Sequence, residues 1–332
     1  MNRQNLSRVV HGGTGIRIKR DTGASILDFS ANINPYPPHL VTAVTQGDLD
    51  EYPDDSYGEL KSVIARHLGR DPQEITVGNG SIEVIRVLCS TILSPGDSVR
   101  ITPPTFGEYE FSARLAGASV AVGPGYKLRF LCNPNNPTGY LMEKNEILRI
   151  LEQCERDNSY LAVDEAFIEI SDDPSQHVAD IRHPLLFVLR SLTKSYAVPG
   201  IRFGFGLGDT ELIEQMEMRR LPWTVNAVAE KIAIAAFMQY SDLSLSRKRI
   251  MEERARLCSA LADLPIEVIP SSANFLLLHL DHDAGPLCDA LLQKGILVRD
   301  CHSFGLPCSI RVAVRCREEN LCLAEALQGC MR

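Results

Sequence analysis

The stretch that decides the fold reads Val-Leu-Arg-Ser-Leu-Thr-Lys-Ser-Tyr-Ala-Val-Pro-Gly-Ile-Arg-Phe-Gly-Phe-Gly, residues 188–206. It continues the apolar run Leu185–Leu189, which predicts a buried strand. The loop and turn after that strand carry two hydroxyls, an amine and a guanidinium: Ser191, Thr193, Lys194 and Arg202. Such groups converge on anions, and a desolvated lysine beside another cation becomes a nucleophile that forms a Schiff base with a carbonyl. The alternative for this stretch alone is a surface loop whose lysine and arginine are solvated.

The composition indicates an ordinary globular protein. The chain has 332 residues, of which 45% are hydrophobic and 23% charged, and this length predicts roughly two domains. The net charge is -8 without a block of like charges, which argues against nucleic-acid or membrane-surface binding. No apolar run approaches the roughly 20 residues that span a bilayer, and the polar start Met1–Asn5 does not resemble a signal peptide. We therefore expect a cytoplasmic protein.

Ten cysteines are present, and six of them fall near the end of the chain: Cys288, Cys301, Cys308, Cys316, Cys322 and Cys330. None of these six forms a C-x-x-C pair, so the spacing does not indicate a zinc site. We expect reduced, mostly buried thiols, with a metal or redox role as the alternative.

Strands and helices alternate between about residues 75 and 205. The pattern predicts strands at 75–77, 99–101, 128–131, 161–163 and 185–189. It also predicts helices at 58–67 and 143–157, one helix that begins at 81, and another that ends at about 115. Such alternation is typical of an α/β fold with a sheet covered by helices on both faces, where ligands bind at the carboxyl ends of the strands.

The last third of the chain predicts a smaller α+β domain. We expect a long helical region over about 226–262, strands at 266–269, 275–280, 296–299 and 310–315, a helix at 286–294 and a final helix. Arg299 and Arg311 each end or interrupt an apolar run, where an arginine usually faces an anion.

Candidate ligand-binding residues follow the predicted strands. Gly80 and Ser81 form a glycine turn that opens a helix, which suits a phosphate, although many such turns bind nothing. Phe106 lies beside a proline turn and offers a flat ring for stacking. Asn136 sits in a loop stiffened by two prolines, and Asp164 ends a buried strand and needs a donor or cation as partner.

A glycine cluster, His11-Gly12-Gly13-Thr14-Gly15, lies near the start of the chain. We expect a flexible loop there, because glycine imposes little conformational restriction. Glycines also let backbone N–H groups approach an anion, while a histidine in such a loop is more often an ordinary loop residue than a ligand.

Several motifs resemble the fold-type-I pyridoxal phosphate enzymes, in the branch that holds histidinol-phosphate aminotransferases. They are Asn-Asn-Pro-Thr-Gly at 135–139, Asp-Glu-Ala at 164–166, and Ser-Leu-Thr-Lys at 191–194 followed by Arg202. Within that branch the chain is more similar to the L-threonine-O-3-phosphate decarboxylases of cobalamin biosynthesis. That closer resemblance rests on His-Gly-Gly at 11–13 and on the segments 28–35, 164–167, 189–194, 222–227 and 311–315.

The resemblance implies a role for each candidate residue. Lys194 would bind pyridoxal 5'-phosphate covalently, Asp164 would pair with its ring nitrogen, Asn136 with its ring oxygen, and Phe106 would stack on the ring. The cofactor phosphate would be held by Gly80, Ser81, Ser191, Thr193 and Arg202, with Tyr52 reaching in from the second subunit of a homodimer. The substrate would be a small phosphorylated amino acid, its carboxylate on Arg311 and its phosphate on His11, Gly12, Asn32 and Arg299, next to Asn136.

The resemblance also implies a domain division and an activity. We expect an N-terminal arm (1–35) belonging to the small domain, a large cofactor-binding domain (36–235) and a small C-terminal domain (236–332). The implied reaction is decarboxylation of L-threonine O-3-phosphate to (R)-1-aminopropan-2-yl phosphate. Phe167 favours this reading, because aminotransferases usually have tyrosine at that position. The alternatives are a histidinol-phosphate or other amino-acid aminotransferase, and a catalytically silent pyridoxal-binding regulator.

One segment departs from the family pattern. Between Ala118 and Phe130 the chain is shorter than in relatives, which have a further strand and helix there. We therefore expect the large domain to lack an element.

Overall fold

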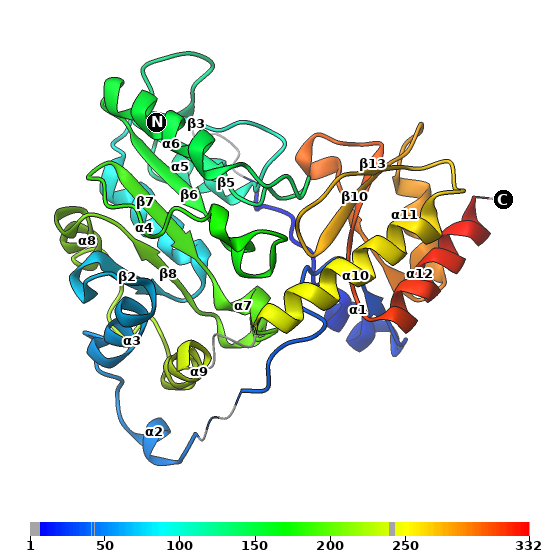
Figure 1. Cartoon of the computed structure of the whole chain (residues 1–332), viewed down its shortest axis with the longest axis horizontal. Coiled ribbons are helices and arrows are strands. Elements are labelled where there is room, and N and C mark those ends of the chain that lie inside the picture. Colours follow the sequence, from blue (N-terminus) through cyan, green and yellow to red (C-terminus); the bar gives the residue numbers. More distant parts are fainter. Residues whose placement is uncertain (1–6, 41, 43, 239–242, 332) are drawn as a thin grey trace.

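The computed structural model describes residues 7–40, 42, 44–238 and 243–331. The polar start Met1–Asn5 and residues 239–242 of the expected helical region lie outside the described part. Figure 1 shows a larger sheet beside a smaller one, with the long helix α10 (Leu243–Leu261) running from the edge of the first toward the second.

The larger sheet has seven strands in the order β2-β8-β7-β6-β5-β3-β4. They are β2 (Ile75–Gly78), β3 (Ser98–Arg100), β4 (Ser119–Val120), β5 (Leu128–Cys132), β6 (Tyr160–Asp164), β7 (Leu186–Arg190) and β8 (Gly204–Leu207). The strands from β4 to β7 pair in parallel, whereas β8 is antiparallel to both of its neighbours. This mixed, mostly parallel sheet confirms the predicted α/β class.

Helices cover both faces of this sheet. They are α3 (Gly58–Leu68), α4 (Ser81–Ile92), α5 (Glu108–Leu115), α6 (Lys144–Arg156), α8 (Thr210–Glu217) and α9 (Ala227–Met238), with the short α2 (Gly47–Asp50) and α7 (Leu192–Ser195). Side chains along β7 alternate between two cores: Phe187 packs in one and Val188 in the other. Both faces are therefore buried, which explains the continuous apolar runs in the sequence.

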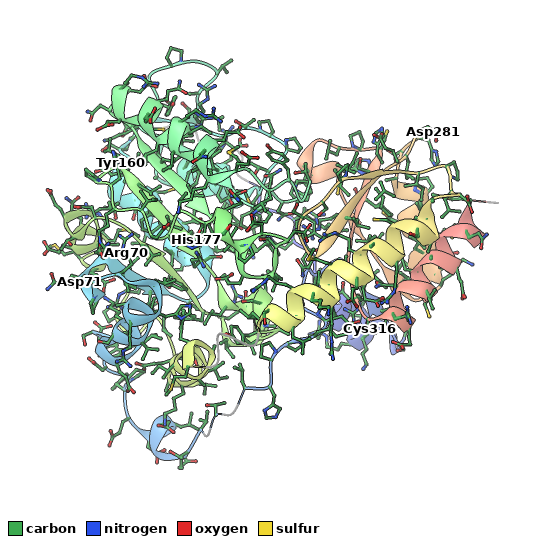
Figure 2. The ribbon with its side chains drawn as sticks, in the orientation of Figure 1. Arg70, Asp71, Tyr160, His177, Asp281 and Cys316 are labelled. Atoms are coloured by element: carbon green, nitrogen blue, oxygen red, sulfur yellow. The ribbon has the colours of Figure 1, made fainter. Side chains whose placement is uncertain are left out.

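The smaller sheet is antiparallel, in the order β12-β13-β10-β9. Its strands and helices are β9 (Glu267–Ile269), β10 (Phe275–His279), β12 (Arg299–Asp300), β13 (Ser309–Ala313), α11 (Gly285–Gln293) and α12 (Arg317–Cys330). A third core of apolar side chains lies against it. In Figure 2 the labelled Asp281 and Cys316 belong to this part, and Tyr160 and His177 to the larger one. The domain boundaries given above stay a prediction.

The N-terminal arm differs from the prediction. The glycine cluster was expected to be a flexible loop, but Gly15 begins the helix α1 (Gly15–Thr22). Gly12 is also tightly packed, since a Cβ there would lie 2.2 Å from the Ser30 carbonyl oxygen. The arm then forms β1 (Leu27–Asp28), which pairs in parallel with β11 (Ile296–Leu297).

Two other expectations need correction. The single strand predicted over 296–299 is divided at Val298, because β11 pairs with the N-terminal arm and β12 with β13. The thiols are free, but only Cys89, Cys154 and Cys301 are buried, so "mostly buried" was wrong.

The shortened segment keeps a strand but no helix. Chain 118–130 forms the two-residue edge strand β4 and then returns to β5 through turns. The cavity described below is lined by no residue from this segment.

Candidate active site

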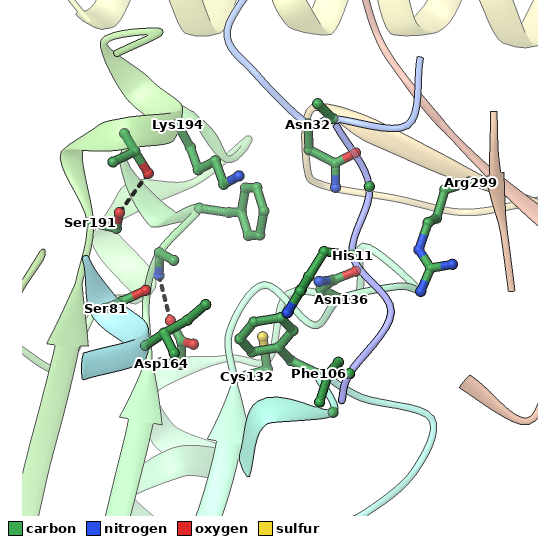
Figure 3. Close-up of a pocket in the computed structure, with 18 of the residues that line it drawn as sticks. His11, Asn32, Ser81, Phe106, Cys132, Asn136, Asp164, Ser191, Lys194 and Arg299 are labelled. Carbon is green, nitrogen blue, oxygen red and sulfur yellow. Dashed lines mark hydrogen bonds between the residues drawn. The ribbon is translucent and has the colours of Figure 1, made fainter. Parts of the chain in front are cut away.

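A cavity of about 400 Å³ opens between the carboxyl ends of β5, β6 and β7 and the smaller sheet. Fourteen of the fifteen residues predicted from the sequence line it: His11, Gly12, Asn32, Gly80, Ser81, Phe106, Asn136, Asp164, Ser191, Thr193, Lys194, Arg202, Arg299 and Arg311. Figure 3 shows Ser81, Ser191 and Lys194 on one side of the cavity and Arg299 on the other. Tyr52 is the exception, because it is exposed and its ring packs on Trp223.

Lys194 lies on the short helix α7, directly after β7. Burial lowers the pKa of its amine to about 8, and the positive charges of Arg311 and Arg202 act in the same direction. The Asp164 carboxylate opposes this shift. The neutral, nucleophilic form of this lysine is therefore more populated near neutral pH than that of an exposed lysine.

Asp164 ends β6 and is 5% exposed. Its Oδ2 accepts a hydrogen bond from the Tyr109 hydroxyl at 2.7 Å, and its Oδ1 accepts one from the Ala166 N–H at 3.0 Å. Burial raises the pKa of this carboxyl to about 6, and these two hydrogen bonds limit the rise. Asp164 thus lines the cavity, and no basic side chain among the described residues forms a hydrogen bond with it, so its carboxyl is suited to a cationic ligand.

An anion cradle lies at the start of α4. Gly80 has φ +81°, and a Cβ there would lie 2.4 Å from Arg202 Nη2. Arg202 itself is held at φ 59°, a left-handed conformation that costs a non-glycine residue about 1–2 kcal/mol. The Ser191 and Thr193 hydroxyls are 2.8 Å apart on the same side. Backbone N–H groups, two hydroxyls and one guanidinium therefore surround a space suited to a phosphate.

A second basic region is supplied by the smaller sheet. Arg299 on β12 and Arg311 on β13 are register partners, and both are at least 94% buried. Arg311 donates to the Ser30 carbonyl at 2.8 Å and to Asn136 Oδ1, while its Nε has no partner. Burial lowers the pKa of Arg311 to about 10. Neither arginine forms an ion pair within the described chain, so the buried charges are matched by neutral acceptors alone.

Asn32 also points to a missing ligand. It is 2% exposed and lines the cavity, yet neither atom of its amide has a hydrogen-bond partner among the described residues. Buried amides are nearly always hydrogen-bonded in folded proteins, so a polar ligand is the expected partner.

Sequence reasoning missed two residues on α5. Tyr109 is fully buried, stacks on Phe130 and holds Asp164. Glu108 is bonded to His11, 97 positions away. The available signal was their position directly after Phe106, at the start of a helix that approaches a ligand site.

The chain is similar to known proteins over most of its length. The family model described as aminotransferase class I and II matches residues 24–130 and 125–327. The chain belongs to the class I and II aminotransferase family. It is 32% identical to a histidinol-phosphate aminotransferase of Symbiobacterium thermophilum, over 95% of this chain and 93% of that protein. It is 35% identical to a Caldanaerobacter subterraneus protein that is provisionally named a threonine-phosphate decarboxylase, over 90% of this chain and 89% of that protein.

The chain is also similar to solved structures of proteins with these two names. The histidinol-phosphate aminotransferase of Clostridium acetobutylicum superposes with a TM-score of 0.81 at 29% identity, covering 92% of this chain and 98% of that one. The L-threonine-O-3-phosphate decarboxylase of Porphyromonas gingivalis superposes with a TM-score of 0.77 at 25% identity, covering 85% of this chain and 91% of that one.

Pyridoxal 5'-phosphate is the cofactor of this family member. The residues present fit it, because the cradle around Gly80 suits its phosphate, Asp164 suits its protonated ring nitrogen and the Lys194 amine suits its aldehyde. When bound, this cofactor accepts the electron pair released at the α-carbon of an amino acid. The chain is therefore an enzyme of the pyridoxal phosphate-dependent aminotransferase and decarboxylase class.

Proposed function

We propose that the enzyme decarboxylates L-threonine O-3-phosphate to (R)-1-aminopropan-2-yl phosphate, a step of cobalamin biosynthesis. The observation that carries this proposal is the neighbouring pair Arg299 and Arg311, two buried cations without a carboxylate partner in the described chain. A substrate that carries both a carboxylate and a phosphate matches both charges. Histidinol phosphate itself carries a phosphate but no carboxylate, and in an aminotransferase only the keto acid of the second half-reaction would bring carboxylates to this pair.

The charges in the cavity support a substrate with two anionic groups. Four lysine and arginine side chains line it, namely Lys194, Arg202, Arg299 and Arg311, together with His11, against the carboxylate of Asp164. The cofactor phosphate would satisfy Arg202 and the hydroxyls beside it. Arg299 and Arg311 then remain for the substrate, and buried arginines favour carboxylates and phosphates with which they form paired hydrogen bonds.

In this proposal each residue has a defined task. Arg311 binds the substrate carboxylate, and Arg299, His11 and Asn32 bind its phosphate, so that the amino acid is held at both ends. The bond between the α-carbon and the carboxylate breaks, carbon dioxide leaves, and the bonding electron pair remains on the amino-acid side, where a bound cofactor would stabilise it. Lys194, with its pKa near 8, donates the proton that replaces the carboxylate and regains one from solvent.

Phe167 supports the same choice. It lines the cavity three residues after Asp164 and packs edge-on against Phe275, with ring centroids 5.2 Å apart. The family resemblance implies tyrosine at this position in aminotransferases. A phenylalanine supplies packing there but no hydroxyl to bond the cofactor.

Transamination of histidinol phosphate is the second candidate, because two of the relatives described above bear that name. Both reactions would use Lys194, Asp164 and the phosphate cradle. They differ in the second substrate, since an aminotransferase needs a keto acid to complete each cycle.

The test compares substrates on cofactor-loaded enzyme. L-threonine O-phosphate should be decarboxylated without a keto acid, and L-threonine at least tenfold less efficiently because Arg299 is left unmatched. Histidinol phosphate with 2-oxoglutarate should yield little glutamate. Glutamate formation with no carbon dioxide from L-threonine O-phosphate would instead establish the aminotransferase.

We also propose a homodimer in which Tyr52 reaches the partner's cofactor. Tyr52 is 80% exposed, its ring centroid lies 4.6 Å from that of Trp223, and Leu221 and Met218 are exposed close by in sequence. Light scattering of the purified protein should give twice the chain mass, and Tyr52→Ala should weaken cofactor binding. A monomer that retains full activity would contradict this.

We also propose that the enzyme is cytoplasmic. All ten cysteines are free thiols, which is the usual state in a reducing compartment. Among the described residues no helix is long and apolar enough to cross a membrane. Fractionation of producing cells should place the enzyme with the cytoplasmic proteins, and recovery from another fraction would contradict the proposal.

A further inference from the structure

We propose that Glu108 is a positioning residue that holds His11 as a cation against the substrate phosphate. The proposal rests on the proposed function, because it assigns His11 to the phosphate of the same substrate. It adds a residue that does not line the cavity itself and acts through the histidine that does.

The contact between the two residues is direct. His11 Nε2 lies 2.9 Å from Glu108 Oε1. Glu108 is 3% exposed, whereas the His11 side chain is 43% exposed and borders the cavity. The pair therefore joins a buried carboxylate to an imidazole that a ligand can reach.

Apart from His11, one cation and the dipole of α5 act on the buried Glu108 carboxylate. Its second oxygen, Oε2, has no hydrogen-bond partner among the described residues and lies 3.6 Å from Arg86, which is half-exposed. Glu108 also occupies the first turn of α5, where the helix dipole favours a negative charge. A buried carboxylate of this kind is stabilised most by a charged donor, and His11 is the closest available.

The geometry of imidazole decides what His11 can do. With Nε2 donating to Glu108, the other ring nitrogen, Nδ1, carries a proton only if the ring is cationic. A neutral ring would present an unprotonated nitrogen, which repels a phosphate dianion. Only the cationic ring can donate to Glu108 from Nε2 and to a phosphate from Nδ1 at the same time.

Arg299 is a second cation in this region, and its charge makes the Glu108 carboxylate necessary for a cationic His11. Arg299 Nη2 donates to the carbonyl of Val10 at 2.8 Å, so its guanidinium lies beside the residue that precedes His11. Two neighbouring cations repel each other in a partly buried site, and the Glu108 charge offsets that repulsion. Among the described residues, Glu108 thus contacts His11 directly, Arg86 contacts Glu108, and Arg299 contacts the neighbouring Val10.

The segment that carries His11 is fixed from both sides. A Cβ at Gly107 would lie 3.2 Å from Val9 Cγ1, so the turn before α5 packs closely on the arm, while Arg299 holds Val10. Phe106, from the same turn, lies 6.0 Å from the His11 ring, centroid to centroid. Because these contacts do not involve the carboxylate, removing its charge should leave the arm in place.

The test uses Glu108→Gln, which keeps the size and the acceptor oxygen but removes the charge. The KM for L-threonine O-phosphate should rise about tenfold, the loss expected for one charge-assisted hydrogen bond, while kcat stays within twofold. The parameters for L-threonine, which has no phosphate, should stay unchanged. Equal effects on both substrates, a loss of kcat alone or no effect would overturn the proposal.

Glu110→Gln is the matched control, because Glu110 lies on the same first turn of α5 but pairs with Arg114 at the surface. It should change neither substrate's KM. In the double variant His11→Ala with Glu108→Gln, the KM should equal that of His11→Ala alone, since Glu108 acts through His11. Additive effects would overturn the proposal.

A spectroscopic readout separates this inference from the proposed function. Nitrogen-15 NMR of the cofactor-loaded enzyme with inorganic phosphate should show a cationic His11 ring in the wild type and a neutral ring in Glu108→Gln. If the wild type fails to decarboxylate L-threonine O-phosphate but shows this difference, the proposed function fails and the phosphate site stands. A neutral ring in the phosphate-bound wild type would overturn the inference, whatever the activity.

Discussion

Lys194 is the residue on which all of the proposed chemistry depends. Its pKa of about 8 arises from burial and from Arg311 and Arg202. Covalent incorporation of pyridoxal phosphate into cofactor-free enzyme should therefore accelerate as the pH rises through 8, because the neutral amine is the reactive form. Lys194→Ala should incorporate none after borohydride reduction, as measured by mass spectrometry, and should show no turnover. Covalent cofactor at another lysine would contradict the assignment.

The Tyr109 hydroxyl should lower the pKa of Asp164. Its hydroxyl donates to the Asp164 carboxylate and lowers the pKa of that group against the effect of burial. In Tyr109→Phe the pKa of Asp164 should rise above its value of about 6, so the acidic limb of the kcat profile should move to higher pH. A hydrogen bond to a charged group contributes about 1.5–3 kcal/mol, so kcat at pH 7 should fall roughly tenfold.

Tyr126→Phe is the control for that variant, because the Tyr126 hydroxyl bonds to Asp157, away from the cavity. Its pH profile should match the wild type. An unchanged acidic limb in Tyr109→Phe would show that the hydroxyl does not tune Asp164.

The contact between β8 and α4 shapes the proposed phosphate cradle. A Cβ at Gly204 would lie 2.4 Å from the Ser81 backbone N, so no side chain fits between the strand and the start of the helix. Gly204→Ala should push the helix away, lower the free energy of unfolding by about 1–3 kcal/mol and weaken cofactor binding, as measured by urea unfolding and absorbance titration.

Gly200→Ala is the matched control, since a Cβ there meets nothing within 4 Å. It should leave both stability and cofactor affinity within the error of the wild type. Comparable losses in the two variants would mean that the close approach at Gly204 does not define the cradle.

Strands and helices of the larger sheet could be predicted because their apolar periodicity is strong and their ends are marked by glycine and proline. The cradle at Gly80 could be located for the same reason. The helix α1 could not, because an exposed eight-residue helix that begins with glycine has little apolar pattern. The pairing of Arg299 with Arg311 and of His11 with Glu108 depends on distant segments meeting, which local pattern does not encode.

The assembled site should reduce the stability of the cofactor-free protein. Lys194 binds its proton less tightly when folded, with a pKa of about 8 against 10.5, so the unfolded chain holds more protons between these values. Stability should therefore rise with pH across that window. Asp164 has the opposite sign, because its pKa is raised from 3.8 to about 6, and its contribution falls as pH rises through that window.

Replacing the buried charge should consequently stabilise the cofactor-free protein while abolishing activity. Lys194→Met should raise the free energy of unfolding at pH 7 by on the order of 3 kcal/mol, measured with urea. Lys127→Met is the control, because Lys127 is half-exposed and pairs with Asp97. This substitution should change the free energy of unfolding by less than about 1 kcal/mol. A destabilised Lys194→Met would contradict this view of the site.

Decarboxylation rather than transamination is the claim that joins these observations, and turnover without a keto acid tests it most directly. Cofactor-loaded enzyme is mixed with excess L-threonine O-phosphate alone, and carbon dioxide is counted per active site while phosphorus NMR follows the product. A decarboxylase should release many molecules of carbon dioxide per site and form an equal amount of 1-aminopropan-2-yl phosphate. No carbon dioxide, with at most one amino group transferred per site, would rule out the decarboxylase and identify an aminotransferase.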